Sequence, residues 1–203
     1  MRGYFAIGVE GLSKPMNAGT LFRSAHAFGA SFVFTIGGVW ARHEAALSDT
    51  AASAAQVPHY HYEGLDDFRL PDRCALVGIE LMEDSAELPS FRHPRCAAYV
   101  LGPERGSLSP ELLARCDHVL RIPTRFCINV AVAGSIVMYD RLLSTGRFAE
   151  RPVVPGGPVT PRPPHVHGKQ IFRSPISSSA PDQGGPAESA RSSAAVGKRE
   201  GRR

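Results

Sequence analysis

The sequence predicts an α/β domain built on a mostly parallel β-sheet with helices on both faces. Short apolar runs suit buried strands, the segments between them have helical spacing of apolar residues, and the two alternate along the chain. Strands that alternate with helices are typical of parallel sheets, because each helix carries the chain back to the edge where the next strand begins.

Five apolar runs rich in Val, Ile, Phe and Tyr are predicted to be strands, and they cover residues 4–9, 31–36, 74–80, 97–101 and 118–122. Helical spacing predicts helices over 17–29, 44–55, 63–70 and 108–116, and the pattern is weakest over 44–55. The most apolar helix is predicted last, over 130–143. One face of it carries Val130, Ala133, Gly134, Val137, Met138 and Arg141, and its small residues indicate close packing against another element.

Charge and composition divide the 203 residues into a domain and a tail. Residues 1–150 hold 14 basic and 16 acidic side chains and carry a net charge of −2, whereas residues 151–203 hold 9 basic and 3 acidic side chains and carry +6. The second part is rich in Pro, Gly and Ser and has few large apolar residues to bury. We therefore predict one domain over 1–150 and a basic, disordered tail over 151–203.

Several classes of protein are not expected from this sequence. No uninterrupted apolar run approaches the roughly 18–20 residues that cross a bilayer, and the start of the chain does not have the pattern of a signal peptide. The four cysteines, at 74, 96, 116 and 127, form no CxxC pair and have no histidine at zinc-ligand spacing, so neither a metal site nor a disulfide framework is expected. We expect reduced thiols in a cytoplasmic protein.

Three segments place polar residues or glycines beside the ends of predicted strands, where open α/β sheets bind ligands. In the first segment, Asn17 is expected to cap the N-terminus of a helix, and Arg23 follows six residues later. A capped helix with a surface arginine would also explain this segment without any function.

The second segment has two glycines, Gly102 and Gly106, on either side of the charged pair Glu104 and Arg105. The glycines would let the backbone approach a ligand closely. The segment is not a phosphate-binding loop of the GxxxxGK[ST] kind, and the chain contains no GxGxxG. A plain turn before a helix capped by Ser109 is the alternative interpretation.

The third segment leaves the last predicted strand at Ile122 and enters the apolar helix, with Asn129 as the expected N-cap. Cys127 lies in this segment and invites the hypothesis of a nucleophile, but no histidine or aspartate lies nearby in the sequence to activate it. We therefore favour a buried or ligand-facing thiol at Cys127.

In this order and at these separations, the three segments resemble the motifs of the SpoU/TrmH family of RNA ribose 2′-O-methyltransferases, in the SPOUT superfamily. The resemblance covers residues 4–145. The first motif is matched by Asn17, Gly19 and Arg23, and the second by Leu101, Gly102, Pro103, Glu104 and Gly106. The third is matched by Ile122, Pro123, Asn129 and Val130, with Cys127 and Ile128 where Ser and Leu are usual.

The resemblance implies methyl transfer from S-adenosylmethionine to a ribose 2′-hydroxyl of RNA, in a domain with a C-terminal deep trefoil knot. It also implies a homodimer whose active sites combine residues of both subunits, with the small-residue face near Ala133 and Gly134 in or beside the interface. We favour tRNA over rRNA as the substrate, because the chain lacks the separate N-terminal RNA-binding domain of many rRNA-directed members. Neither a metal nor a membrane is implied.

By the same resemblance, the catalytic residues are Arg23, Asn17, Glu104 and Asn129. Arg23 would act as a general base or as an electrostatic stabiliser of the developing alkoxide and a flanking phosphate, Asn17 and Glu104 would position Arg23 or the substrate, and Asn129 would brace its loop. The cofactor would be held by Ile79, Leu101, Gly102, Ile122, Cys127 and Ile128. A thiol forms weaker hydrogen bonds than the usual hydroxyl, so Cys127 could alter activity or substrate choice.

Two other interpretations stay open at this point. One is an RNA-binding protein of the same fold that does not transfer methyl groups, which the departure at Cys127 would explain. The other is an unrelated nucleotide-binding α/β domain of the oxidoreductase type, although its glycine fingerprint is missing. For RNA binding, four arginines could form a basic rim around the active site: Arg23, Arg105, Arg121 and Arg125. The basic tail either adds non-specific affinity for phosphates or has no role.

Overall fold

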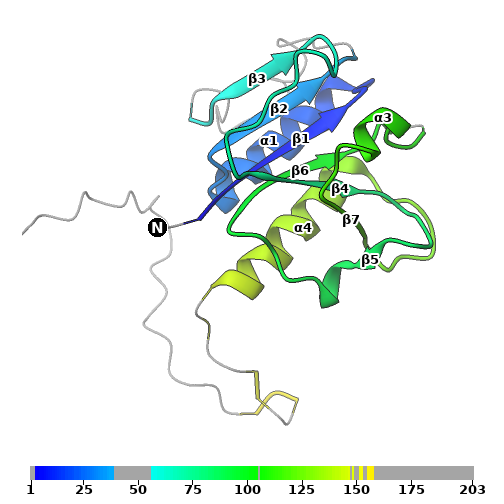
Figure 1. Ribbon diagram of the computed structural model, residues 1–203. Coiled ribbons are helices and arrows are strands. Elements are labelled where there is room, and N and C mark those ends of the chain that lie inside the picture. Colours follow the sequence, from blue (N-terminus) through cyan, green and yellow to red (C-terminus); the bar gives the residue numbers. More distant parts are fainter. Residues whose placement is uncertain are drawn as a thin grey trace, which may run out of the picture.

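The computed structural model describes residues 3–38, 56–104, 106–146, 148, 151–152 and 155–157. Its centre is a seven-stranded sheet with the order β3-β2-β1-β6-β4-β7-β5, and all neighbouring strands are parallel (Figure 1). The strands are β1 (Tyr4–Glu10), β2 (Phe32–Ile36), β3 (His59–Tyr62), β4 (Ala75–Ile79), β5 (Ala86–Glu87), β6 (Cys96–Leu101) and β7 (His118–Arg121). The helices are α1 (Pro15–Phe28), the short 3-10 turn η2 (Leu88–Ser90), α3 (Pro110–Leu113) and α4 (Val130–Thr145).

The five predicted strands are confirmed as β1, β2, β4, β6 and β7, and their ends differ from the prediction by one residue at most. Two strands were not predicted. The sequence of β3 is HYHY, which is not an apolar run, and this strand lies at the edge of the sheet, where less of it is buried. The other, β5, has only two residues.

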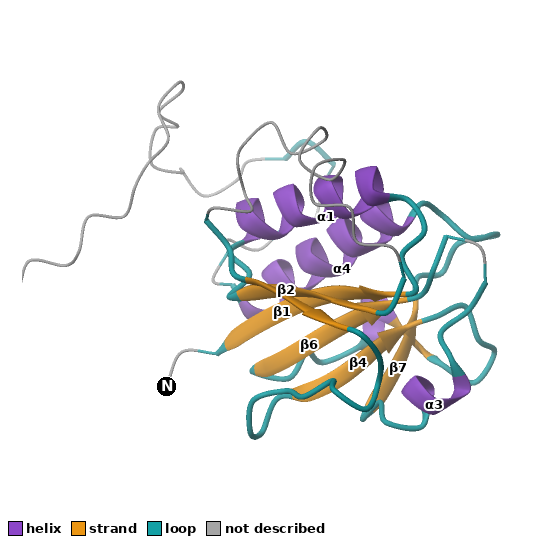
Figure 2. Ribbon diagram, turned by 90° about the horizontal axis from the view of Figure 1, so that it is seen from above, coloured by secondary structure: helices purple, strands orange, loops and turns teal. Residues whose placement is uncertain are grey.

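Helices lie on both faces of the sheet, but unequally. The two long helices, α1 and α4, lie side by side on one face (Figure 2), where their apolar side chains share a core with strand residues such as Ile7 and Tyr99. On the other face, Phe34 and Val100 share a second core with Phe68 and with Leu112 of α3. That face is therefore covered by α3 and the segment 63–74 rather than by long helices.

The predicted apolar helix is confirmed as α4, and Gly134 allows it to lie close to α1. A Cβ atom at this position would clash with Leu21 Cδ1 and lie 3.2 Å from Ile7 Cδ1. Ala133 is buried in the same core. The small residues thus pack inside the chain, and the expectation that they lie in or beside an interface between subunits stays a prediction.

The expectation that Asn17 caps α1 is wrong. The helix begins at Pro15, and Lys14, in an extended conformation, occupies the N-cap position without a side-chain capping bond. Proline suits the first helical position because its φ angle is already helical and its missing N–H would have had no helical partner. Asn17 consequently lies inside the first turn, and its side chain can bond to another part of the chain.

The helix predicted over 63–70 is absent, because the carbonyl groups of this segment are satisfied in another way. Arg115 donates to the carbonyl oxygens of Leu65 at 2.6 Å and Phe68 at 2.9 Å, while the Phe68 side chain is buried under the sheet. The segment therefore forms turns that cover the sheet without becoming helical.

The helix predicted over 108–116 is shorter than expected, since α3 spans only Pro110–Leu113. Its predicted N-cap is confirmed, because Ser109 Oγ accepts a hydrogen bond from the Leu112 N–H. The helix predicted over 44–55 and most of the predicted tail, residues 158–203, lie outside the described residues. Within the described part of the chain, no helix is long and apolar enough to span a membrane.

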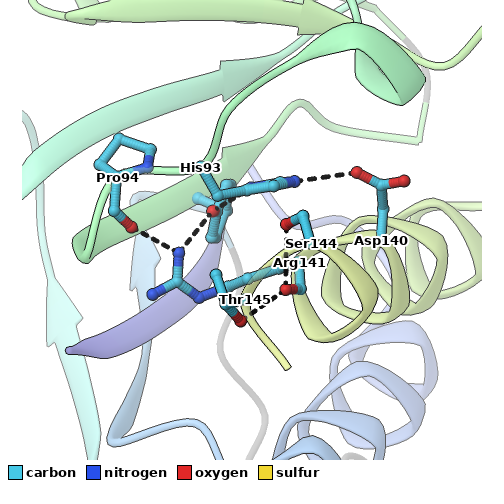
Figure 3. A network of polar contacts seen from close by, with 7 residues as sticks. His93, Pro94, Asp140, Arg141, Ser144 and Thr145 are labelled. Atoms are coloured by element: carbon cyan, nitrogen blue, oxygen red, sulfur yellow. Dashed lines mark hydrogen bonds and ion pairs between the residues drawn. The ribbon is translucent and has the colours of Figure 1, made fainter. Parts of the chain in front are cut away.

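A buried polar network fastens the C-terminal half of α4 to the amino ends of β1 and β6 (Figure 3). The guanidinium of Arg141 donates to the carbonyl oxygens of Pro94 (2.6 Å), Arg95 (2.8 Å) and Tyr4 (3.3 Å), and to Tyr99 Oη (3.1 Å). The prediction that Arg141 lies on the packed face of this helix is thus confirmed, and its charge is satisfied mainly by backbone oxygens.

The imidazole of His93 continues this network. Its Nε2 lies 2.9 Å from Asp140 Oδ2 of α4 (Figure 3). Its Nδ1 lies 2.5 Å from Tyr99 Oη. The side chain of His93 is fully buried, whereas that of Asp140 is partly exposed. The network therefore fixes the position of α4 along its axis at the end opposite to Asn129.

Candidate active site

A cavity of about 510 Å³ lies beside the carboxyl ends of β4 and β6, between the start of α1 and the start of α4. This is the edge of the sheet where the sequence predicts a ligand, and the volume suits a small-molecule site. The floor is apolar and buried, and it consists of Ile79, Leu101, Val130 and Ala133. We call the more exposed lining residues its mouth, and they are Lys14, Leu81, Gly106, Cys127 and Asn129.

Most of the residues singled out in the sequence meet at this cavity. The six residues expected to hold a cofactor all line it, namely Ile79, Leu101, Gly102, Ile122, Cys127 and Ile128. Three of the four expected catalytic residues, Asn17, Glu104 and Asn129, line it as well. Arg23 is not among the described lining residues; it is exposed on α1, six residues or ~9 Å along the helix from Asn17.

A chain of hydrogen bonds joins the three motifs at the cavity. Glu104 Oε1 accepts from Asn17 Nδ2 at 2.9 Å, and Glu104 Oε2 accepts from the Oγ of Ser13 at 2.6 Å and from its N–H at 3.2 Å. Asn17 Oδ1 in turn accepts from Asn129 Nδ2 at 3.1 Å. Ser13 was not predicted, because no local pattern marks a residue whose partner lies 91 positions away.

These hydrogen bonds keep Glu104 ionised. Partial burial acts to raise the pKa of its carboxyl group, but the hydrogen bonds from Ser13 and Asn17 outweigh burial and hold the pKa below its ordinary value. An ionised carboxylate only accepts hydrogen bonds, so the NH₂ group of Asn17 must face Glu104 and its oxygen must face Asn129. The charge of Glu104 thus fixes the orientation of both amides.

Two further carboxylates hold the segment that follows β6. Glu80 Oε2 accepts from the Leu108 N–H at 2.8 Å, and Glu10 accepts from the N–H and Oγ of Ser109 at 2.7 and 2.6 Å. Glu10 ends β1 and Glu80 directly follows β4, so this segment is held against the carboxyl ends of both strands. Neither carboxylate was predicted, although both come directly at strand ends, where functional side chains gather.

Gly102 is required by the packing of the chain itself. A Cβ atom there would lie 3.1 Å from the Leu108 nitrogen, 3.3 Å from the Ser107 carbonyl carbon and 3.5 Å from Glu80 Oε2. The missing side chain thus makes room for residues 107–108, and Gly102 also lines the cavity, where its predicted close approach to a ligand stays a prediction.

The third motif forms the wall between the floor and the mouth. Asn129 caps α4 as predicted, because its Oδ1 accepts from the N–H groups of Ala131 at 2.9 Å and Val132 at 3.4 Å. Cys127 lines the cavity and is exposed, so of the two favoured settings it has the ligand-facing one and not the buried one. Among the described residues, no three His, Cys, Asp or Glu side chains lie close enough together to hold a metal ion.

This arrangement suits a ligand with an apolar, flat part and a polar part. The buried aliphatic floor would contact the apolar part, and the polar side chains of Asn17, Glu80, Glu104 and Asn129, which also line the cavity, would face the polar part. The residues present thus fit an adenosine-like cofactor.

Comparisons with known proteins show the family and the fold of this chain. Residues 4–139 match the model of the SpoU rRNA Methylase family. The mouse (Mus musculus) tRNA (guanosine(18)-2′-O)-methyltransferase TARBP1 is 25% identical over 138 residues, which are 64% of this chain and 9% of that protein. The chain thus spans only a small part of this curated relative.

Solved structures with this fold include a Sinorhizobium meliloti rRNA methyltransferase (20% identity, TM-score 0.64, 72% of this chain and 60% of that chain). They also include the SpoU methyltransferase AviRb from Streptomyces viridochromogenes in complex with AdoMet (20% identity, TM-score 0.62, 70% of this chain and 61% of that chain). A third structure concerns the 2-OH methylation of C/U34 on tRNA (22% identity, TM-score 0.60, 70% of this chain and 91% of that chain). Because the family model extends from the first strand into the last helix and covers more than half of the chain, the protein belongs to the SpoU rRNA methylase family.

Proposed function

We propose that this protein transfers a methyl group from S-adenosylmethionine to a ribose 2′-hydroxyl of RNA, and that its substrate is tRNA rather than rRNA. The observation that carries the proposal is the hydrogen-bond chain Ser13–Glu104–Asn17–Asn129, which joins three family motifs at one cavity. The mouse relative is by name a tRNA 2′-O-methyltransferase, and a related solved structure concerns 2-OH methylation on tRNA. Both support a tRNA ribose as the acceptor.

For the cofactor, we assign the roles expected from the sequence. Ile79, Leu101 and Ile128 would contact its apolar part, and groups of Gly102, Ile122 and Cys127 would bond its polar edges. S-adenosylmethionine supplies an electrophilic methyl group on a positively charged sulfonium. AviRb was solved in complex with this cofactor, which supports the assignment.

In the transfer itself, the chain has to orient the 2′-hydroxyl and stabilise the oxygen as it loses its proton. Asn17, Glu104 and Asn129 form a rigid polar wall at the mouth, which would orient the ribose. We assign Arg23 to electrostatic stabilisation of the developing alkoxide and a flanking phosphate, because the planar fork of N–H donors in a guanidinium suits oxyanions.

We further propose that the protein is a homodimer and that Arg23 acts at the cavity of the second subunit. Arg23 is not among the residues that line the cavity of its own chain, which supports a site that a second copy completes. The outer face of α4 carries four apolar side chains that are 36–52% exposed, at spacings typical of one helix face: Val132, Ile136, Tyr139 and Leu142. A second copy of the chain would cover this stripe.

The deep trefoil knot implied by the family resemblance is part of the same proposal. Strand β6 lies between β1 and β4, both of which precede it in sequence, and the chain then continues to β7 beyond β4 before α4 returns to α1. Two late strands thus lie between earlier ones, β6 between β1 and β4 and β7 between β4 and β5, and this order suits a chain that threads through its own earlier loop.

The experiment that tests this function measures transfer of labelled methyl from S-adenosylmethionine to total tRNA and, separately, to rRNA, followed by nucleoside mapping. We expect label in 2′-O-methylated nucleosides of tRNA. Label in rRNA would move the protein to the other substrate class, and label on bases would contradict 2′-O-transfer. Binding of cofactor and RNA without incorporation would favour an RNA-binding protein that has lost the activity.

A further inference from the structure

We infer that Lys14 is a positioning residue for the RNA, and that its ammonium group binds a phosphodiester beside the target ribose; this inference rests on the proposed function. Lys14 lines the cavity at the N-cap of α1, next to Ser13 of the hydrogen-bond chain. It is the only lysine among residues 1–150, where the other 13 basic side chains are arginines.

Lys14 differs from the other polar lining residues because its side chain is not used by the fold. The amide, hydroxyl and carboxylate side chains that line the cavity all have hydrogen-bond partners within the chain, and they belong to Asn17, Glu80, Glu104, Thr124 and Asn129. Lys14 has no side-chain hydrogen bond or ion pair to the described residues. Its three donors are therefore available to a ligand.

The charge balance of the cavity points to an anionic ligand group at Lys14. The other charged residues that line the cavity in the described chain are Glu80 and Glu104, and both are carboxylates. A phosphodiester that approached this wall without a cation would be repelled. The net charge of residues 1–150 is −2, so attraction of RNA to the domain has to come from local cations, and Lys14 is the cation among the described lining residues.

The position of Lys14 favours RNA over the carboxylate of the cofactor. Lys14 is exposed, while the lining residues of the floor are buried and apolar. A small cofactor fills the floor first, whereas a large polymer can reach only the mouth. Ser13, the neighbour of Lys14, bonds to Glu104 of the wall that would orient the ribose, so a phosphate beside that ribose is the anionic group that we assign to Lys14.

The test compares Lys14→Met, which removes the charge, with Lys14→Arg, which keeps it. For each variant we would measure binding to total tRNA by fluorescence anisotropy over a range of salt concentrations, cofactor binding by calorimetry, and kcat and KM for methyl transfer. Arg92→Ala serves as the matched control, because Arg92 is an exposed cation that precedes β6 and so lies at the opposite end of the sheet.

We expect Lys14→Met to weaken tRNA binding about tenfold, as for the loss of one charge-assisted hydrogen bond. The slope of log K against log salt should fall by roughly 0.7–0.9, the value for one phosphate contact. The KM for tRNA should rise with little change in kcat, cofactor affinity should not change, and Lys14→Arg should restore binding. Arg92→Ala should leave the slope unchanged.

Three results would overturn the inference. An unchanged salt slope in Lys14→Met, with a wild type that methylates RNA, would reject the role of Lys14 and leave the proposed function intact. A loss of cofactor affinity would assign Lys14 to the cofactor instead. If the wild type binds and methylates no RNA, the proposed function and the inference fail together.

Discussion

At the scale of single residues, Glu104 has the largest influence on the geometry of the site. Its two oxygens accept three hydrogen bonds, and these bonds orient Asn17 and, through it, Asn129. An amide of the same shape cannot replace the carboxylate, because an NH₂ group would face a donor on one side or the other. The negative charge itself is thus required, and not only the shape of the side chain.

We therefore expect Glu104→Gln to lower the free energy of unfolding by ~1–2 kcal/mol at neutral pH and to abolish most methyl transfer. Because the pKa of Glu104 is lowered by folding, its contribution is present above the ordinary carboxyl pKa and is lost as pH falls through the folded value. The difference between wild type and variant should shrink in that acidic range. Urea unfolding at several pH values measures this, with the highly exposed Glu63→Gln as the control.

The cysteines offer a second residue-scale prediction. Burial raises the pKa of the Cys116 thiol to about 11, whereas Cys127 is exposed at the cavity. Because the thiolate is the reactive form, iodoacetamide should alkylate Cys127 well before Cys116. A bound cofactor product, S-adenosylhomocysteine, should protect Cys127. Mass spectrometry of tryptic peptides measures both rates, and equal protection of all four cysteines would show general stabilisation instead of occupancy of the cavity.

At the scale of the elements, α4 connects the site to the far end of the sheet. Asn129 caps its start at the cavity, and the network of Arg141, Asp140 and His93 fastens its other half (Figure 3). A carboxylate only accepts, so His93 Nε2 carries a proton toward Asp140, and neutral His93 accepts from the Tyr99 hydroxyl at Nδ1. Tyr99 Oη then accepts from Arg141, so the Nε2–H of His93 and the hydroxyl of Tyr99 both have acceptors within this network.

Protonation of His93 would break this arrangement, since Nδ1–H would face a tyrosine oxygen that already accepts from Arg141, and the tyrosine proton would lose its acceptor. Burial lowers the pKa of His93 below its ordinary value, and the bond to Asp140 offsets burial only in part. The unfolded chain therefore binds more protons than the folded one as pH falls below about 6.5. The contribution of His93 to the free energy of unfolding is therefore fully present above that pH and decreases below it.

The corresponding prediction concerns acid stability. The free energy of unfolding of the wild type should fall below about pH 6.5 with a contribution from His93 of at most ~1.4 kcal/mol per pH unit, the limit for one proton. His93→Gln should be less stable at pH 7 but should lose this part of the pH dependence. Denaturant titrations from pH 7.5 to pH 5 measure both effects. The exposed His118→Gln is the control, and an identical pH profile in His93→Gln would contradict the assignment.

At the scale of the whole molecule, the proposed dimer explains why one of the four expected catalytic residues lies outside the cavity. Arg23 on α1 and Glu104 at the cavity would come from different subunits at each site. Two variants that are each inactive should then complement one another, because one site of a mixed dimer would combine an intact Arg23 with an intact Glu104.

We expect Arg23→Ala and Glu104→Gln to be inactive alone, with cofactor binding retained in Arg23→Ala. After co-refolding in equal amounts, about half of the dimers should be mixed and half of their sites intact, so activity should return to about a quarter of the wild-type value. The control is Arg23→Ala refolded by itself under the same conditions, which should stay inactive. No recovery, in a sample shown to contain mixed dimers, would place both residues in one subunit.

By itself, the sequence determined the features that depend on local chemistry. Apolar runs predicted five strands to within one residue at each end. Local residue types predicted the Asn129 cap and the proline at the start of α3, and the spacing of three motifs indicated the family. Only the tertiary structure decided how distant residues combine. Glu104 accepts hydrogen bonds from Ser13, 91 positions away, and Glu10 accepts from Ser109, 99 positions away. Where a helix was predicted over 63–70, Arg115 instead donates to the carbonyl oxygens of Leu65 and Phe68. Such bonds form because the parallel sheet brings the carboxyl ends of separate strands to one edge, and no local pattern records which side chains meet there.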